Sequence, residues 1–373
     1  MAKIRVLVVD DSAVMRKVIS EILAEDPAIE VADTAVDGHI ALSKVATLKP
    51  DVVTLDVEMP VMNGLEALAE IRKVAPSLPV IMFSTLTERG AAVTVEALTL
   101  GASDYCTKPT QQGNATAARE SIRSELLPKI KALCSRRPAA APPPLRPVAP
   151  APVAAARRST ARPVQIVAIG ISTGGPSALS RVLPRIPGSL PVPVVIVQHM
   201  PAVFTNLLAG RLAVNSEISV SEGKEGTVLH AGEAWIAPGD LHMTVARDGN
   251  SCRLRMNTGP KENFCRPSVD VLFRSVADVY GPNALAVVMT GMGADGLLGS
   301  KRIREAGGEV IVQDENSSVV WGMPGMVHAA GQADGVYPLD SLAGEITRRV
   351  LQSRRHSSPA APELAVPPPA RAH

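Results

Sequence analysis

The chain lacks the features that mark membrane-spanning, disulfide-stabilised and nucleic-acid-binding proteins. None of its apolar runs approaches the roughly 18 residues that suggest a transmembrane helix. Its four cysteines are scattered and form no C-x-x-C pair, which argues against a zinc site or a disulfide framework. A net charge of +2, with 20% charged residues, leaves no sequence-wide basic surface for nucleic acid or an anionic membrane. We therefore expect a cytoplasmic protein that neither binds nucleic acid nor inserts into a membrane.

Aromatic residues are also scarce, with two Trp, three Tyr and four Phe in 373 residues. So few rings give no sign of a large aromatic pocket for a substrate. Hydrophobic residues nevertheless make up 46% of the chain, which is enough for real cores, and the length favours two domains.

Proline, alanine and arginine dominate residues 136–163, and a second proline-rich segment lies at 356–373. Neither segment has the apolar periodicity of a helix or strand, so we expect an extended linker and a disordered tail. The expected organisation is a first domain at 1–125, a helix end and linker at 126–163, a second domain at 164–355 and a tail at 356–373.

Both folded parts alternate strand-like and helix-like runs, which predicts an α/β fold with doubly wound, mainly parallel sheets. Residues 216–258 are richer in glycine, threonine and short β-prone runs such as 234–237, so we expect an antiparallel hairpin there. The first part is expected to have strands at 4–9, 51–55 and 80–83 and helices at 13–24, 38–48, 64–74 and 89–100, and the second part strands at 164–169, 193–197, 284–289 and 309–312.

Charged residues follow the predicted strands of the first part. Asp10 and Asp11 follow one strand, Asp56 follows another, and Lys108 comes after the segment 103–107. The carboxyl ends of parallel strands meet at one edge of a sheet, so these side chains should lie together. Clustered carboxylates repel one another unless a cation is present, and Mg²⁺ suits such oxygen ligands. Asp56 would then accept a phosphoryl group, although Asp10 or Asp11 taken alone is equally well explained as a helix cap.

Three motifs in this part closely resemble the response-regulator receiver domain, over nearly all of residues 3–125. They are VVDDS at 8–12, LDVEMPVMNG at 55–64 and TKP at 107–109. The resemblance implies a flavodoxin-like domain in which Asp56 is the phosphoacceptor. The roles that it implies for other residues are Mg²⁺ binding by Asp10, Asp11, Asp56 and the backbone carbonyl of Glu58, and switching by Ser84, Tyr105 and Lys108.

Three short motifs each follow an aliphatic run in the second part: GISTGG at 170–175, QHMP at 198–201 and TGMGADG at 290–296. They place Ser172, His199 and Asp295 just beyond the ends of predicted buried strands, where parallel sheets form a crevice. A hydroxyl, an imidazole and a carboxylate brought together there have the chemical makings of a nucleophilic hydrolase.

Each motif also has a simpler reading. The segment 170–174 satisfies G-x-S-x-G, but the order serine, histidine, aspartate is not that of α/β-hydrolases, and no HGGG-type loop is visible. A phosphate-binding loop is disfavoured because G-x-x-x-x-G-K-[ST] is absent. His199 alone is equally well explained as a structural histidine, and Asp295 alone as a turn residue.

Together these motifs look like the CheB family, the receiver-regulated protein-glutamate methylesterases of bacterial chemotaxis. APGDLH at 237–242, RPSVD at 266–270 and GMP at 322–324 extend the match, which covers almost the whole chain except the tail. The resemblance implies a Rossmann-like esterase domain that needs no metal, beside a receiver that uses Mg²⁺. The residue roles that it implies are Ser172 as nucleophile, His199 as general base and then acid, Asp295 as the supporting carboxylate, and Thr173 and the backbone around Met292 as oxyanion support.

The family also implies partners and regulation. The substrates would be methyl-accepting chemoreceptors, demethylated at glutamate methyl esters and deamidated at glutamines, and the phosphodonor a chemotaxis histidine kinase. The unphosphorylated receiver would pack over the esterase crevice, and phosphorylation of Asp56 would relieve that block. One residue departs from the pattern: Cys265 stands where we expect histidine, which puts substrate contacts there in doubt.

Two rival interpretations stay open. A phosphorylation-dependent binding protein without turnover would be expected to lack a residue of the triad, and none is missing here. A general esterase or amidase cannot be separated from a receptor-specific enzyme by sequence, whereas an assay with a small carboxylic ester would separate them.

Overall fold

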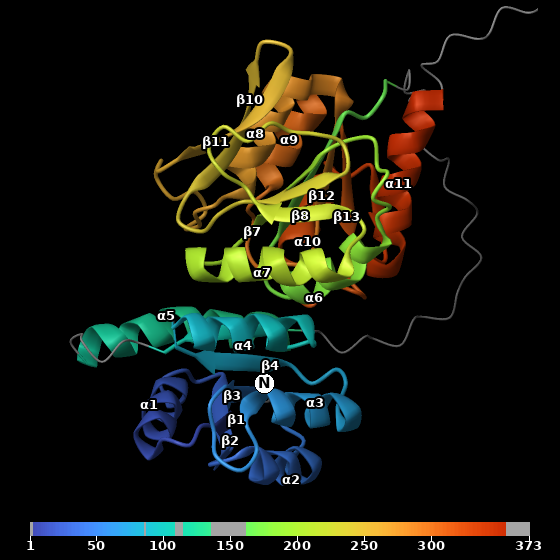
Figure 1. Cartoon of the computed structure of the whole chain (residues 1–373). Coiled ribbons are helices and arrows are strands. Elements are labelled where there is room, and N and C mark those ends of the chain that lie inside the picture. Colours follow the sequence, from blue (N-terminus) through green and yellow to red (C-terminus); the bar gives the residue numbers. More distant parts are fainter. Residues whose placement is uncertain (1–2, 86, 109–114, 136–161, 356–373) are drawn as a thin grey trace, which may run out of the picture.

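The computed structural model describes residues 3–85, 87–108, 115–135 and 162–355. It consists of two α/β units stacked on one another (Figure 1). The expected linker and tail, at 136–163 and 356–373, lie almost entirely outside the described residues. Among the described residues, no helix is both long and apolar enough to cross a membrane.

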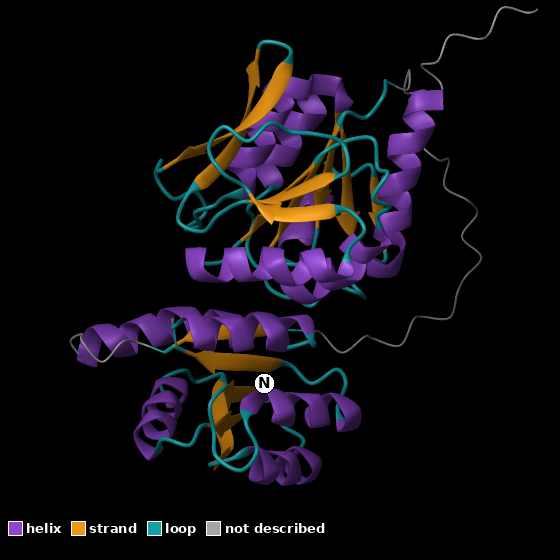
Figure 2. Cartoon of the chain, in the orientation of Figure 1, coloured by secondary structure: helices purple, strands orange, loops and turns teal. Residues whose placement is uncertain are grey.

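The first unit is a five-stranded parallel sheet in the order β2-β1-β3-β4-β5, with helices on both faces (Figure 2). Every residue of β3 and β4 is buried, as continuous apolar strands in such sheets are. The strands are β1 (Ile4–Val9), β2 (Ile29–Ala35), β3 (Val52–Asp56), β4 (Val80–Ser84) and β5 (Asp104–Thr107). The helices are α1 (Ala13–Ala24), α2 (Gly38–Leu48), α3 (Gly64–Val74), α4 (Glu88–Thr99) and α5 (Ala115–Cys134).

Local capping explains where several of these helices begin. The Ser12 hydroxyl accepts a hydrogen bond from the Met15 amide at the start of α1. At α3, Asn63 and Glu66 form a capping box, in which each side chain accepts from the other residue's amide. These caps set the loops that follow β1 and β3, and those loops carry the acidic residues.

The second unit is built on a seven-stranded sheet in the order β14-β13-β12-β6-β7-β9-β8, in which all neighbouring strands run parallel. Its strands are β6 (Ile166–Ile171), β7 (Val194–Gln198), β8 (Ser219–Glu222), β9 (Glu233–Ile236), β12 (Ala284–Val288), β13 (Glu309–Gln313) and β14 (Gly335–Tyr337). Its helices are α6 (Gly175–Val182), η1 (Leu183–Arg185), α7 (Ala202–Asn215), α8 (Val269–Tyr280), η2 (Gly281–Asn283), α9 (Leu297–Glu305), α10 (Met323–Ala329) and α11 (Leu339–Arg355).

The expected hairpin exists but is shorter than the segment that suggested it. The strands β10 (His242–Asp248) and β11 (Ser251–Asn257) pair antiparallel as a separate two-stranded sheet. The β-prone run at 234–237 instead contributes β9, which joins the parallel sheet between β7 and β8. Within 216–258, therefore, only the second half interrupts the α/β pattern.

The two units touch along α4, β5 and α5 of the first and α6 and α7 of the second (Figure 1). The Tyr105 ring stacks on the Phe204 ring with centroids 4.8 Å apart. Val320 of the second unit packs into the apolar cluster that contains Ile122 and Leu126 of α5. The receiver-like unit thus shares buried apolar contacts with the unit that carries Ser172.

Candidate active site and phosphoacceptor site

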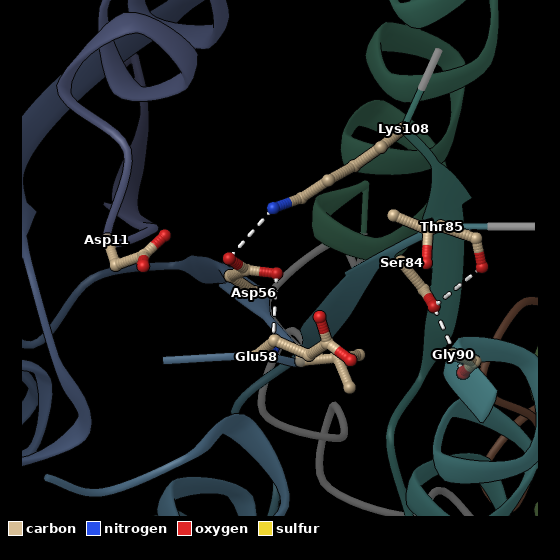
Figure 3. A pocket seen from close by; sticks show the side chains of 8 residues that line it. Asp11, Asp56, Glu58, Ser84, Thr85, Gly90 and Lys108 are labelled. Carbon is tan, nitrogen blue, oxygen red and sulfur yellow. Dashed lines mark hydrogen bonds and ion pairs between the residues drawn. The ribbon is translucent and has the colours of Figure 1, made fainter. Parts of the chain in front are cut away.

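The acidic residues of the first unit meet at one edge of its sheet, as the alternating pattern predicts. Ligand oxygens of Asp10, Asp11 and Asp56 lie within 4.8 Å of one another. The Lys108 ammonium lies 2.9 Å from Asp10 and 2.7 Å from Asp56. Figure 3 shows Lys108 reaching from the end of β5 toward Asp56 across a cavity of about 190 Å³ that Glu58 also lines.

The electrostatics of this cavity suit a divalent cation. Burial, together with the charge of Asp10, raises the pKa of Asp56 to about 6, although Lys108 opposes the shift. A bound cation would relieve this repulsion, and the donors are hard carboxylate oxygens of the kind that Mg²⁺ prefers. Asp10, Asp11 and Asp56 therefore fit a magnesium ion.

Of the three residues expected to act in switching, Lys108 contacts Asp56, Ser84 ends β4 and Tyr105 lies in β5. Ser84 is buried, and its hydroxyl donates to the Gly90 carbonyl of α4 at 3.1 Å (Figure 3). Tyr105 faces the second unit, between the Phe204 ring and the Lys129 ammonium, which lies 4.8 Å from the ring centroid. Tyr105 therefore links β5 of the receiver-like sheet to α7 of the other unit.

Strand order brings the three motifs of the second unit together. β6 lies between β12 and β7, and Ser172, His199 and Asp295 follow these three neighbouring strands. Ser172 and His199 line a cavity of about 460 Å³. His199 Nε2 and Asp295 Oδ2 are 2.8 Å apart, with Asp295 2% exposed. The expected histidine and aspartate therefore form a bonded pair next to the expected serine.

The carboxylate binds Nε2 of the imidazole, which leaves Nδ1 as the nitrogen available to the nucleophile. Among the described residues, no hydrogen bond joins Ser172 to His199. Catalytic hydrogen bonds in unliganded sites are often long and tighten only when substrate binds. The Ser172 amide donates to the Thr290 carbonyl at 3.0 Å, which ties the serine to the Asp295 loop.

The ionisation of the pair follows from burial opposed by mutual attraction. Burial alone lowers the pKa of His199, but the hydrogen bond to Asp295 and the neighbouring Cys265 sulfur raise it to about 9. Burial alone raises the pKa of Asp295, whereas His199 and backbone amides lower it to about 2. The aspartate is therefore charged at neutral pH, and the imidazole holds its proton firmly.

Sequence reasoning missed the groups that hold Asp295. Its Oδ1 accepts from the Ser268 hydroxyl at 2.9 Å and from Asn263 Nδ2 at 3.0 Å, and its Oδ2 accepts from the Val269 amide at 2.7 Å. Asp270 is a second buried carboxylate, whose pKa is raised by burial and by the charge of Asp295. The RPSVD motif at 266–270 contains three of these groups, but sequence alone gives no sign that they face Asp295.

The two expected oxyanion donors, the Met292 amide and the Thr173 hydroxyl, differ in whether they already have a hydrogen-bond acceptor. Among the described residues, the Met292 amide has no hydrogen-bond acceptor, and the next residue, Gly293, has a φ of 86° that favours glycine. The Thr173 hydroxyl instead donates to Asp104 Oδ2 of the receiver-like unit at 2.7 Å. The Gly174 amide donates to the Ser103 carbonyl at 3.0 Å. Acceptors of the first unit thus occupy two donors beside Ser172.

These two sites define a class of protein: a receiver domain joined to a hydrolase-like α/β domain. Family models agree, with "Response regulator receiver domain" matching residues 6–119 and "CheB methylesterase" matching 167–346.

Named relatives cover nearly the whole chain. A "Protein-glutamate methylesterase/protein-glutamine glutaminase" of Trichodesmium erythraeum is 51% identical over 94% of this chain and 100% of its own length. One of Nocardioides sp. is 48% identical over 96% and 99%. The solved Thermotoga maritima CheB methylesterase catalytic domain is 38% identical over 49% of this chain and 97% of its own, with a TM-score of 0.49. The chain belongs to the protein-glutamate methylesterase/protein-glutamine glutaminase family, as its motifs predict.

Proposed function

We propose that this chain demethylates glutamate methyl esters and deamidates glutamines on chemoreceptor helices, through a Ser172-His199-Asp295 triad. The observation that carries the proposal is the 2.8 Å bond between His199 and buried Asp295, in the cavity that Ser172 lines. Three groups that follow adjacent strands are held by a rigid sheet, which suits chemistry that depends on position.

In this mechanism the uncharged form of His199 takes the hydroxyl proton of Ser172 as the serine oxygen attacks the γ-carbonyl of the methyl ester. Asp295 keeps the imidazole oriented and stabilises its charged form. The proton then passes to the departing methoxide, which leaves as methanol, and an acyl-enzyme remains. Water activated by His199 hydrolyses that ester, which leaves a glutamate side chain on the receptor and restores the Ser172 hydroxyl. With glutamine as substrate the leaving group is ammonia.

The tetrahedral intermediate needs donors aimed at its oxyanion. The free Met292 amide supplies one, because adjacent Gly291 and Gly293 let the backbone approach closely. Thr173 supports the same region once its hydroxyl is released from Asp104.

Regulation follows from the contact between the units. In this proposal the observed contact is the blocked state, because Asp104 and Ser103 occupy donors beside Ser172 and Tyr105 packs on Phe204. A phosphoryl group on Asp56 adds negative charge and acceptor oxygens within reach of Ser84 and Lys108. Mg²⁺ bound by Asp10, Asp11, Asp56 and the Glu58 carbonyl would neutralise the charge that develops. Repositioning of Ser84 and Tyr105 then loosens the contact.

A chemotaxis histidine kinase donates the phosphoryl group, and chemoreceptors are the substrates, so the enzyme works in the cytoplasm, where both present their reactive groups. The receiver spans 1–125 and the methylesterase domain 164–355. The esterase half needs no metal, since a serine and an imidazole supply nucleophile and base.

The test is methanol release from methylated chemoreceptor membranes, with and without a small phosphodonor plus Mg²⁺. We expect release that rises with the phosphodonor and is lost in Ser172→Ala. Release that does not depend on Ser172 would contradict the nucleophile assignment. Binding to the membranes without any release would favour the non-catalytic rival, and equal rates on small carboxylic esters would favour a general esterase.

A further inference from the structure

An exposed phenylalanine stands at the rim of the catalytic cavity. Phe264 is 97% exposed, and it is the one aromatic among the large apolar side chains that are exposed in the described part of the chain. It lines the same cavity as Ser172 and His199. Single exposed apolar side chains are common on protein surfaces, so it is the position of this ring at the rim, rather than its exposure alone, that calls for an explanation.

The backbone holds this ring outward by an unusual turn. The amides and carbonyls of Glu262 and Cys265 bond reciprocally, at 3.1 Å and 2.8 Å. Asn263 and Phe264 between them have φ values of 50° and 64°, the pattern of a type I′ turn. Such a turn prefers glycine at its second central position, so a phenylalanine there is strained. The turn therefore keeps an aromatic residue at a position where one is unfavourable for stability.

The turn is anchored to the catalytic machinery rather than free. Asn263 Nδ2 donates to Asp295 Oδ1 and to Asp270 Oδ2, both at 3.0 Å. Glu262 forms an ion pair with Arg274 of α8 at 2.5 Å. The position of Phe264 relative to the triad is thus fixed by hydrogen bonds on one side and an ion pair on the other.

The shape of a helical substrate indicates which of its side chains would contact the Phe264 ring. Ser172 lies within a cavity, so an esterified glutamate side chain must enter it from a backbone that stays outside. On a helix, residues three and four positions away lie on the same face as that glutamate. Those neighbours pass over the rim, where Phe264 and half-exposed Met292 are the large apolar side chains that the described residues of the second unit expose.

We propose that Phe264 is a substrate-recognition residue, whose ring packs on an apolar side chain three or four positions from the target residue of the receptor helix. The inference rests on the proposed function and adds a protein contact outside the reacting atoms. Phe264 determines which glutamates are reached, whereas the triad performs the reaction.

The experiment measures demethylation of methylated receptor membranes by full-length, phosphodonor-activated enzyme as a function of receptor concentration. Four proteins are compared: the wild type, Phe264→Ala, Phe264→Leu and the control Leu351→Ala, which shortens an exposed side chain of α11. The rate at which a small fluorophosphonate labels Ser172 is measured in parallel, because this probe is too small to span the rim.

We expect Phe264→Ala to raise KM for the receptor about tenfold, with Phe264→Leu in between and Leu351→Ala like the wild type. The ratio of receptor demethylation to fluorophosphonate labelling should fall by a similar factor in Phe264→Ala. A KM within twofold of wild type would overturn the proposal, as would an equal loss in both assays, which would mean that the turn only supports Asp295. Absence of both activities in the wild type would instead contradict the proposed function.

Discussion

The two halves of this molecule carry their chemistry in different ways. In the receiver, Asp10, Asp56 and Lys108 come from short motifs at strand ends, and Lys108 forms an ion pair with each of the two carboxylates. In the esterase domain, the proposed triad residues also follow strand ends, but Asp295 is held by groups from 263–270, the segment that leads from β11 into the first turn of α8. The residues of the charged pocket could therefore be predicted from strand-end motifs alone. The hydrogen bonds that hold Asp295 beside His199 come from another part of the sequence, and those motifs do not predict them.

The largest effect should come from the nucleophile. Ser172→Ala removes the proposed nucleophile, so methanol release should fall by about 10⁴-fold or more. The matched change in the other half, Ser84→Ala, should leave unstimulated release intact and reduce only the response to phosphodonor. Parallel membrane assays of both variants would show whether catalysis depends on the esterase domain and the response to phosphodonor on the receiver. Similar losses in the two variants would contradict the division.

Asp295 should come next. Asp295→Asn keeps the shape of the side chain but removes the charge that orients and stabilises the imidazolium, so kcat should fall by about 10³- to 10⁴-fold. Steady-state kinetics on methylated receptors measures the loss. Asp270→Asn, a neighbouring buried carboxylate that does not contact His199, provides the control and should lose far less activity. Equal losses would assign catalysis to the pair of carboxylates as a whole.

Asp56→Asn should abolish the response to phosphodonor without impairing the proposed triad. This variant lacks the carboxylate that we propose as phosphoacceptor, so release with phosphodonor plus Mg²⁺ should equal release without them. Measured phosphorylation should be lost in parallel. Stimulation that persists in this variant would show that the phosphodonor acts at a site other than Asp56.

Some features of the fold and the sites are predictable from the sequence, and others are not. The strand-end positions of Asp56, Ser172, His199 and Asp295 were predictable, because buried aliphatic runs mark parallel strands clearly. β2 was not, since Glu30, Asp33 and Thr34 make this edge strand polar. The contacts of Asn263 and Asp104 were also out of reach, because they depend on how distant segments dock, and periodicity carries no information about docking.

The interface contact predicts a moderate gain of activity. Asp104→Asn weakens the hydrogen bond that Thr173 donates to a charged acceptor, so unstimulated methanol release should rise about tenfold. Arg211→Ala, which removes an exposed ion pair with Glu96 at the same interface, should change release by less than about fivefold. If unstimulated methanol release rose in Arg211→Ala but not in Asp104→Asn, the block would depend on a part of the interface other than the Asp104–Thr173 hydrogen bond.

The smallest effect concerns pH. The pKa of His199 is raised to about 9, so the basic form accumulates as pH increases, and activity should climb between pH 6 and 9. Cys265 contributes to that rise, so Cys265→Ala should move the pH–rate profile to lower pH and increase the rate at pH 7, by less than about tenfold. Rate profiles of wild type and Cys265→Ala test this. A profile that moves to higher pH would give the Cys265 sulfur the opposite influence.

We propose that the receiver controls access to Ser172, and the most direct test is the rate at which a small fluorophosphonate labels that serine. Wild type and Asp56→Asn would each be followed with and without phosphodonor plus Mg²⁺. We predict that labelling accelerates several-fold with phosphodonor in the wild type only. Identical rates under all four conditions, in protein shown to be phosphorylated, would contradict the claim that the contact of Asp104 and Tyr105 with the esterase domain blocks the site.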